Sequence, residues 1–319
     1  MLDERTIPDA QLPTWMQQAR RGVDWGVIIV MILSIFVAWP LIANRHLPAY
    51  TALENYAFQV NDASTSILQG WFFPRWSATA LNGYGTPLPH YQPSAAADVA
   101  AFVNVLFLND PERVIRVVMI AAFLLAGSTT YVLVMQRSGA QTGMLAAALY
   151  LFSPYVALMT PYVRGDLPEV LSLAAMPTLL WAINRQLQRN QPLDSLAIAI
   201  STAFILLNDP LWLLLSLLPI TALFLDDFRA NWRRTKLVTI SGSILLGIGV
   251  ASFFWLPALL EKDIVRWLPP LVQSRTEPIS FLGLFARTET LDPAALVHYP
   301  QWNLGWALLI FVNRSSSSR

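Results

Sequence analysis

Long apolar runs separated by short polar segments make up most of this chain. A helix needs about 20 mostly apolar residues to cross the hydrocarbon core of a bilayer. Most of the runs reach or approach that length, so the pattern predicts an all-α, polytopic integral membrane protein. The runs cover residues 25–43, 94–108, 114–135, 142–159, 168–184, 194–208, 211–225, 237–257 and 304–312.

The run Ser94–Leu108 decides the predicted topology. It is about 15 residues long and contains Asp98 and Asn104, which makes it short and polar for a span. Cytoplasmic loops of membrane proteins collect Lys and Arg. If this run stays in the outer interface without crossing, every short basic loop falls on the same side of the membrane. The basic loops are the N-terminal segment, 136–141, 185–193 and 226–236.

This placement predicts about seven spans and a cytoplasmic N-terminus. Trp39 and Pro40 close the first run where a cleavage site would need small residues, so we expect an uncleaved anchor. The last run is too short to cross a bilayer, which suggests a C-terminally truncated chain. The expected parts are a cytoplasmic tail at 1–24, a transmembrane domain at 25–260 with an outer loop at 45–113, an extracytoplasmic loop at 261–303, and a truncated final span and tail at 304–319.

Composition supports the membrane assignment and argues against several functions. Hydrophobic residues make up 55% of the chain and charged residues 13%, whereas soluble proteins carry about 25% charged residues. A net charge of +1 provides no concentrated basic surface for nucleic acid. Without cysteine there is no thiolate nucleophile, and the three scattered histidines argue against a His-based metal site.

Nucleotide-binding motifs are missing from the sequence. It has no Walker-type Gly-Lys-Ser/Thr and no Gly-x-Gly-x-x-Gly after a strand. Direct use of ATP or of a nucleotide-sugar therefore lacks support. A donor that already resides in the membrane, such as a polyprenyl-phosphate sugar, needs no such motif.

The first outer loop begins with a predicted amphipathic helix, Glu54–Gln69, on the membrane surface, with Gly70 as its C-cap. Glu54, Phe58 and Asp62 are spaced four apart and share one broad helix face. A carboxylate there can act as a general base toward a hydroxyl, or hold a divalent cation that neutralises a leaving phosphate. From spacing alone, a solvated helix face is the commoner explanation.

The rest of this loop is aromatic and rich in Gly and Pro, with the sequence GWFFPRWSATALNGYGTPLPHYQP over residues 70–93. Arg75 can clamp a lipid phosphate, or it can be an interfacial arginine beside a belt tryptophan, Trp76. Tyr84, between two glycines that favour a tight turn, and Tyr91 suit stacking on sugar rings and interfacial anchoring equally.

Two further outer segments carry charge. Arg164, Asp166 and Glu169 lie within six residues at a span boundary, where ionisable groups suggest a functional site. The alternative is a water-exposed turn with Arg164 paired to Asp166, which contributes little to stability. Glu261 and Lys262 follow the aromatic end of another span, which by itself is an ordinary membrane exit.

Taken together, these residues resemble a bacterial family of multi-spanning proteins with the GT-C glycosyltransferase architecture, often labelled "membrane protein, 6-pyruvoyl-tetrahydropterin synthase-related". The likeness covers about residues 25–262. It rests on Glu54-Asn55-Tyr56, Gly70, Pro74-Arg75-Trp76, Gly83-Tyr84-Gly85-Thr86-Pro87, Tyr91, Pro93, Ser153-Pro154-Tyr155, Gly165-Asp166-Leu167-Pro168-Glu169, Phe254-Trp255-Leu256-Pro257-Ala258-Leu259 and Glu261-Lys262.

The resemblance implies inverting transfer of a sugar from a polyprenyl-phosphate donor on the extracytoplasmic face. Glu54 falls nearest the acidic position of the first loop, where many relatives have Asp, and Asp62 is a second candidate base. Asp166 matches the second acidic position and would orient the acceptor or a possible divalent cation. Arg75 and Arg164 would hold phosphate.

Membrane lipids and the lipid-linked sugar are the expected partners, and nucleic acid is not. The other expected substrate-binding residues are Trp76, Tyr84, Tyr91, Glu169, Glu261 and Lys262. The alternative is a non-enzymatic protein, either a lipid or polymer export partner or an inactive truncated remnant. The soluble tetrahydropterin enzyme of the label binds zinc through clustered histidines, and this chain has no such cluster.

Overall fold

The computed structural model describes residues 24–44, 46–49, 51–231 and 234–261, and within these ranges every regular element is a helix. Three of these helices, Pro111–Ser138, Ala140–Arg164 and Leu167–Arg189, are long and apolar enough to cross a membrane. A bent pair, Lys236–Val250 with Ser252–Leu260, makes a fourth candidate if it is counted as one span. The prediction of an all-α membrane protein is confirmed.

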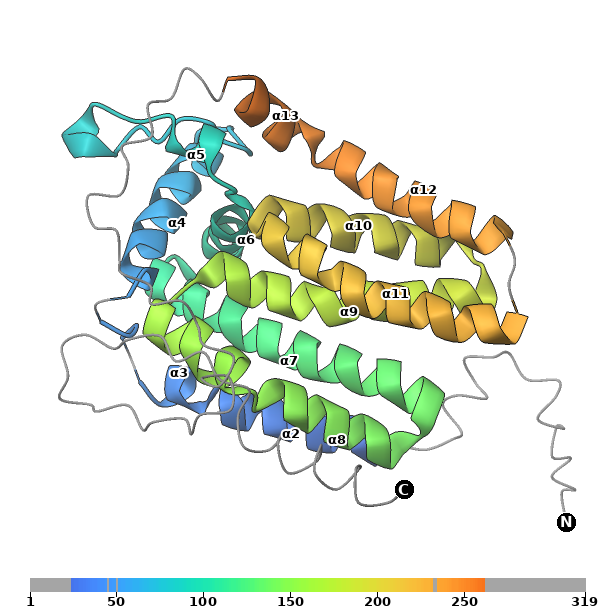
Figure 1. Ribbon diagram of the computed structural model, residues 1–319. Helices are drawn as coiled ribbons and strands as arrows, with labels where there is room; N and C mark the ends of the chain where they lie inside the picture. The colour runs from blue at the N-terminus through green and yellow to red at the C-terminus, as the bar shows by residue number, and fades with distance from the viewer. Residues whose placement is uncertain (1–23, 45, 50, 232–233, 262–319) are drawn as a thin grey trace, which may run out of the picture.

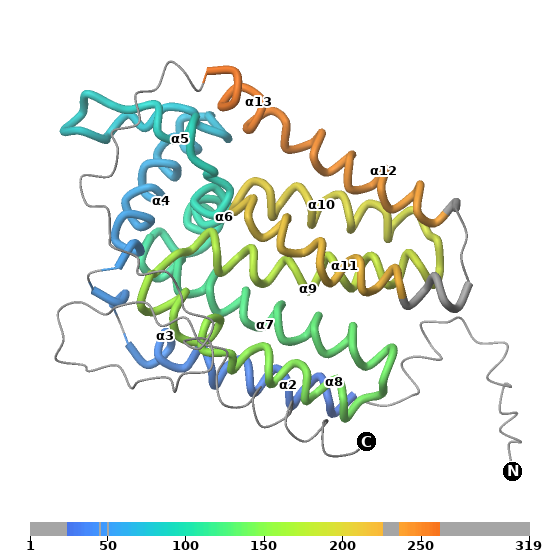
Figure 2. The backbone as a smooth tube through the Cα atoms, viewed as in Figure 1, coloured from blue at the N-terminus to red at the C-terminus, as the bar shows by residue number. Residues whose placement is uncertain are grey.

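A bundle of roughly aligned helices forms the body of the molecule (Figure 1). Within it, α7 packs against α2, α8 and α9, while α10 packs against α9 and α12. The tube in Figure 2 shows that the axes of these helices are roughly aligned. The bundle helices are α2 (Trp25–Val37), α7 (Pro111–Ser138), α8 (Ala140–Leu151), α9 (Leu167–Arg189), α10 (Pro192–Asn208), α11 (Pro210–Asn231) and α12 (Arg234–Val250).

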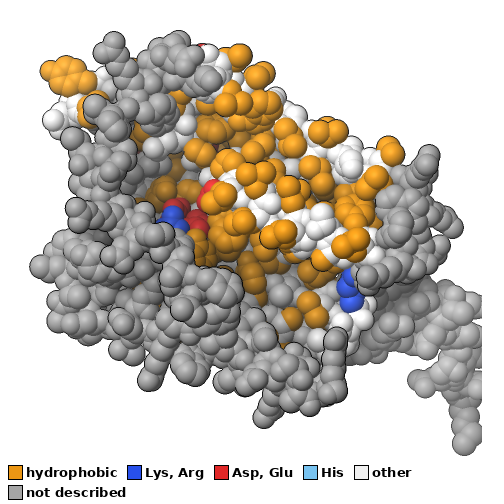
Figure 3. Space-filling model, viewed as in Figure 1, with side chains coloured by type: hydrophobic (Ala, Val, Ile, Leu, Met, Phe, Trp, Pro, Cys, Tyr) orange, Lys and Arg blue, Asp and Glu red, His pale blue; other side chains and the backbone are white. Residues whose placement is uncertain are grey.

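Side-chain size and burial explain how the bundle is held together. Tyr131 and Phe123 of α7 are almost completely buried, whereas Leu218 of α11 is 73% exposed. The exposed apolar side chains form the outer surface of the bundle, as expected of helices that face lipid. Figure 3 shows this surface as mostly hydrophobic over α10, α11 and α12.

The segment between α3 and α7 folds across one end of the bundle. It contains α4 (Leu53–Leu68), a short turn η2 (Leu81–Gly83), α5 (Leu88–Tyr91) and α6 (Ala95–Val103), which continues as η3 (Asn104–Leu108). In Figures 1 and 2, α6 is seen nearly end-on while α7 and α9 run across the view. The segment 94–108 therefore does not run parallel to the bundle helices. Its predicted place in the outer interface stays a prediction.

Two predicted spans are interrupted. The run 25–43 divides at Ala38 into α2 and α3 (Trp39–Ala43), because Pro40 has no N–H to continue the ladder of the preceding helix. The run 237–257 bends by 63° between α12 and α13 (Ser252–Leu260). The Trp255 indole donates to the Ile248 carbonyl across this bend at 3.0 Å. The sequence predicted a span over each run and did not indicate these two breaks.

Other predicted helix boundaries agree with the structure more closely. Asn208 ends α10 and Pro210 begins α11, as the proline predicted. Gly70 follows α4 with a φ of +93°, a left-handed conformation that suits glycine after a helix. The run 142–159 forms α8 and then a π-helix, η4 (Tyr155–Arg164), which ends five residues beyond the predicted end of the run.

Candidate functional site

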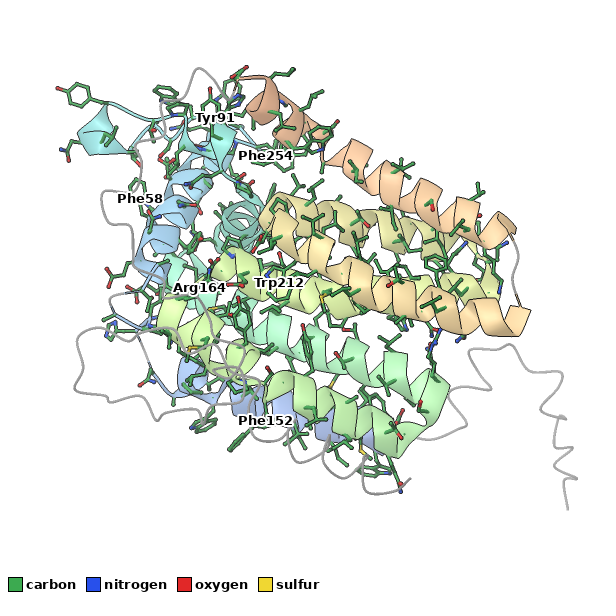
Figure 4. The ribbon with its side chains drawn as sticks, viewed as in Figure 1. Phe58, Tyr91, Phe152, Arg164, Trp212 and Phe254 are labelled. Atoms are coloured by element: carbon green, nitrogen blue, oxygen red, sulfur yellow. The ribbon has the colours of Figure 1, made fainter. Side chains whose placement is uncertain are left out.

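Polar side chains gather at the end of the bundle that α4, α5 and α6 cover. Figure 4 places Arg164 and Trp212 there, below Phe58, Tyr91 and Phe254. Figure 3 shows acidic and basic side chains together in a recess at this end, beside the otherwise apolar face. These polar groups form three arrangements: a cavity between α4 and α6, a latch between α5 and α13, and a charged cluster at the start of α9.

The first arrangement is a cavity of about 290 Å³ enclosed by α4, α6 and the loop between them. Its polar lining contains two carboxyl groups and three carboxamides, and its apolar lining contains Phe58 and several prolines and leucines. The lining side chains that matter below are Asn55, Phe58, Gln59, Asp62, Gln92 and Asp98.

Asp62 is held rigidly in this cavity. Its side chain is almost fully buried, at 4% exposure. Thr79 donates to its Oδ1 from both the backbone N–H, at 3.2 Å, and the hydroxyl. The two bonds fix the carboxyl plane and fall on the same oxygen. The loop after α4 thereby positions Asp62, since Thr79 is 17 residues away in sequence.

Asp98 is the second carboxyl of the cavity and lies in α6, 7% exposed. The Ser94 hydroxyl donates to its Oδ2 at 2.7 Å. Burial disfavours the charged carboxylate and raises the pKa of Asp98 to about 6, although the Ser94 hydrogen bond opposes the shift. At neutral pH this carboxyl is therefore much easier to protonate than a solvated aspartate.

The second arrangement joins the loop to α13. The His90 Nε2 lies 3.0 Å from Glu261 Oε2, and the Tyr91 hydroxyl donates to the same oxygen at 3.1 Å. These two contacts lower the pKa of Glu261 below its usual range, and Arg75 adds a smaller effect in the same direction. We call this group, His90 with Tyr91 and Glu261, the α5–α13 latch.

Arg75 docks on α13 beside the latch, where its Nη2 donates to the Phe253 carbonyl at 2.9 Å. That carbonyl needs a donor because Pro257, four residues later in α13, has no N–H for the helix bond. Arg75, His90 and Asp98 also line a gap of about 20 Å³, which is room for about one water. The gap shares Asp98 with the larger cavity, so Arg75 lies next to it.

The third arrangement surrounds Arg164 at the end of η4. Its guanidinium donates to Asp166 at 3.0 Å, to the Tyr155 hydroxyl at 3.1 Å and to the buried Glu169. Glu169 also accepts from Tyr155 and from the Trp212 indole at 3.3 Å. The sequence left open a simple exposed ion pair, and the structure instead shows a partly buried network from three helices.

Asp166 connects this network to α9. Its Oδ1 accepts from the Glu169 N–H at 3.2 Å and so caps the helix. Burial raises the pKa of Asp166, with a further contribution from Asp209, while Arg164 and the cap bond oppose the shift. Tyr56 of α4 also lies against this carboxyl. The cluster thus joins α4, η4 and α9.

The structure does not bring all the expected site residues together. Glu54 is exposed on α4 and does not line the described cavity, whereas Asp62 does. Trp76 is 53% exposed and Tyr84 is 88% exposed. Trp76 packs over Gly85, where a Cβ would approach its indole nitrogen to 2.4 Å. Lys262 lies outside the described residues.

No group of three or more His, Asp or Glu side chains within the described ranges is arranged to hold a metal ion. Asp62 and Asp98 line the same cavity. The expected divalent cation stays a prediction.

Three contributors were not among the predicted site residues. Asp98 was noted in the sequence as a reason against a span, and its position in a short apolar helix was the available signal. His90 acts through Glu261, 171 residues away. Thr79 acts through Asp62, and nothing in its local sequence marks it.

Comparisons with known proteins agree with the architecture. A family model described as "6-pyruvoyl-tetrahydropterin synthase related domain; membrane protein" matches residues 84–314. No curated protein and no solved structure matches the chain.

Proposed function

We propose that this chain, which belongs to the 6-pyruvoyl-tetrahydropterin synthase-related family of membrane proteins, is a glycosyltransferase that uses a polyprenyl-phosphate sugar. The reaction would take place at the bundle end covered by α4, α5 and α6. We place this end outside the cytoplasm, because the described basic loops, 136–141 and 185–193, lie at the opposite end of the bundle.

One observation carries the proposal. A cavity of about 290 Å³ holds two buried carboxyl groups, Asp62 and Asp98, and adjoins a guanidinium, Arg75. Transfer of a sugar from a phosphate needs a base for the acceptor hydroxyl and a cation for the leaving phosphate. The cavity and its edge provide both groups.

The chemistry assigns a role to each group. The acceptor oxygen attacks the anomeric carbon from the face opposite the phosphate, and its proton passes to Asp62. The bond between the anomeric carbon and the phosphate oxygen breaks, and polyprenyl phosphate leaves with both electrons of that bond. Arg75 stabilises the charge that develops on the phosphate. Burial and the Thr79 bonds favour Asp62 over the exposed Glu54 as the base.

Transfer can be tested with a labelled polyprenyl-phosphate hexose supplied to membranes that contain the full chain. The expected result is movement of label out of the polyprenyl-phosphate fraction. Asp62→Asn should slow this at least about 100-fold, as loss of a general base does. Glu54→Gln should leave the rate within about twofold. Equal rates for wild type and Asp62→Asn would remove Asp62 from the chemistry.

A further inference from the structure

The size of the α4–α6 cavity restricts what it can hold. At about 290 Å³ it lies at the lower limit of small-molecule pockets, which span about 300–1,000 Å³. Liquid water uses about 30 Å³ for each molecule and covalently bonded atoms pack more closely, so the cavity has room for at least about ten non-hydrogen atoms. One six-membered ring with its substituents, about twelve such atoms, is of this size.

The charges around the cavity restrict the ligand further. Its described lining contains Asp62 and Asp98 and no lysine or arginine. Both carboxyl groups are more than nine-tenths buried, so neither is screened well by water. Placing an anionic ring beside them is unfavourable. The lining therefore disfavours an anionic ligand and favours one that donates hydrogen bonds. The guanidinium of Arg75 lies outside the cavity, at the water-sized gap.

Hydrogen-bonding capacity in the cavity is left unused by the protein. Gln59 and Gln92 make no side-chain hydrogen bond within the described residues, and each has an acceptor oxygen and two N–H donors. The bonds from Thr79 and Ser94 each occupy a single oxygen of Asp62 and Asp98. A ring that carries several hydroxyl groups, which both donate and accept, matches these groups.

Phe58 provides the apolar side of the cavity. It lies on α4, one turn before Asp62, and lines the cavity together with prolines of the loop. A pyranose has one face of C–H groups, and such groups are attracted to the negative face of an aromatic ring. An aromatic side chain beside carboxyl and carboxamide groups therefore complements both faces of a sugar ring.

We infer that the α4–α6 cavity binds one neutral hexopyranose ring, held by Gln59, Gln92, Asp62 and Asp98 against Phe58. The inference rests on the proposed function in that this ring would be the sugar of the lipid-linked donor, with its phosphate outside at Arg75. It adds selectivity: neutral hexopyranosides are accepted and uronic acids are rejected.

Saturation-transfer difference NMR on the purified full chain in lipid nanodiscs tests the inference without any transfer reaction. The probes are the methyl glycosides of glucose, galactose, mannose and glucuronic acid. We expect at least one neutral glycoside to bind and the glucuronide to bind at least about tenfold more weakly. Binding of none of the neutral glycosides, or preference for the glucuronide, would overturn the inference.

Variants then locate the binding site. Gln59→Ala combined with Gln92→Ala should weaken binding of the neutral glycoside about tenfold, because about two hydrogen bonds are lost. The melting temperature should not change, since neither side chain bonds to another described residue. Gln69→Ala, at the end of α4 and outside the cavity lining, is the matched control and should bind as the wild type does. Unchanged binding in the double variant would refute the site.

The two proposals fail in different ways. If neutral glycosides bind in the cavity but no label leaves the polyprenyl-phosphate fraction, the glycosyltransferase proposal fails and the binding site stands. If label is transferred and the double variant keeps the wild-type kcat/KM, the transferase proposal stands and the assigned sugar site fails.

Discussion

Asp98 gives the most direct test of the electrostatics of the cavity. Its pKa rises from 3.8 to about 6 in the folded protein because the side chain is buried. Between about pH 4 and pH 6 the folded protein therefore holds a proton that the unfolded chain has released. The stability that Asp98 contributes is fully present below about pH 4 and is lost as the pH rises through about 6.

The rise of the Asp98 pKa from 3.8 to about 6 corresponds to about 3 kcal/mol of folding free energy. Asp98→Asn removes the ionisable group and keeps an acceptor oxygen for the Ser94 hydroxyl. At pH 7.5 we expect this variant to be more stable than the wild type by up to about 3 kcal/mol, or about 5–10 °C in Tm. At pH 4 the two proteins should melt together.

Intrinsic tryptophan fluorescence during heating, in one detergent over pH 4 to 8, measures the effect. Ser94→Ala is the matched variant, since the Ser94 bond lowers the pKa of Asp98. Removing that bond should move the loss of stability to higher pH. A Tm difference between Asp98→Asn and wild type that is the same at pH 4 and pH 7.5 would refute burial of an ionisable carboxyl here.

Three further predictions concern the latch, the loop turn and the charged cluster. Glu261→Gln should loosen the α5–α13 latch, and so should acidification below the lowered pKa of Glu261. Spin labels on Tyr84→Cys and Leu259→Cys, in a chain without native cysteine, should then give a broader distance distribution, and an unchanged one contradicts the latch. Gly85→Ala should lower the free energy of unfolding more than Gly83→Ala does. Both glycines have positive φ, which costs alanine about 1 kcal/mol at each position, but only at Gly85 does the new Cβ meet the Trp76 ring. Equal melting temperatures would place Trp76 elsewhere. Asp166→Ala removes the cap of α9 and should lower the free energy of unfolding by about 1 kcal/mol. Asp166→Asn should lower it less, because asparagine also caps helices. Equal losses of stability in the two variants would show that the cap bond does not stabilise α9.

The parts of the fold that the sequence predicted correctly depend on local chemistry. The amphipathic pattern of residues 54–69 predicted α4, and Pro210 predicted the turn between α10 and α11. The length of segment 94–108 and the basic loops around it predicted a helix in the outer interface. The structure shows a helix that does not run along the bundle, and its place in the membrane stays a prediction. In each case the information lies within about 20 residues or in an additive property such as charge.

The parts that sequence reasoning missed depend on long-range contacts. The bend between α12 and α13 follows from packing and is bridged by Trp255, and a hydropathy pattern has no sign of it. Asp62 and Glu54 lie on the same predicted helix face. Only the position of Thr79 and of α6 shows that Asp62 is buried in a cavity while Glu54 is exposed.

Arg75 shows how the fold can fix a cation without neutralising it. The sequence left two roles open, a phosphate clamp and a snorkelling arginine. Pro257 deprives the Phe253 carbonyl of its helix partner, and Arg75 takes that place. A carbonyl occupies one of the five N–H donors of the guanidinium and removes none of its charge. Glu261, a carboxylate whose pKa Arg75 helps to lower, is already bound by His90 and Tyr91 and is 42% exposed. The proline thus anchors Arg75 at the edge of the cavity while its positive charge stays available for a phosphate.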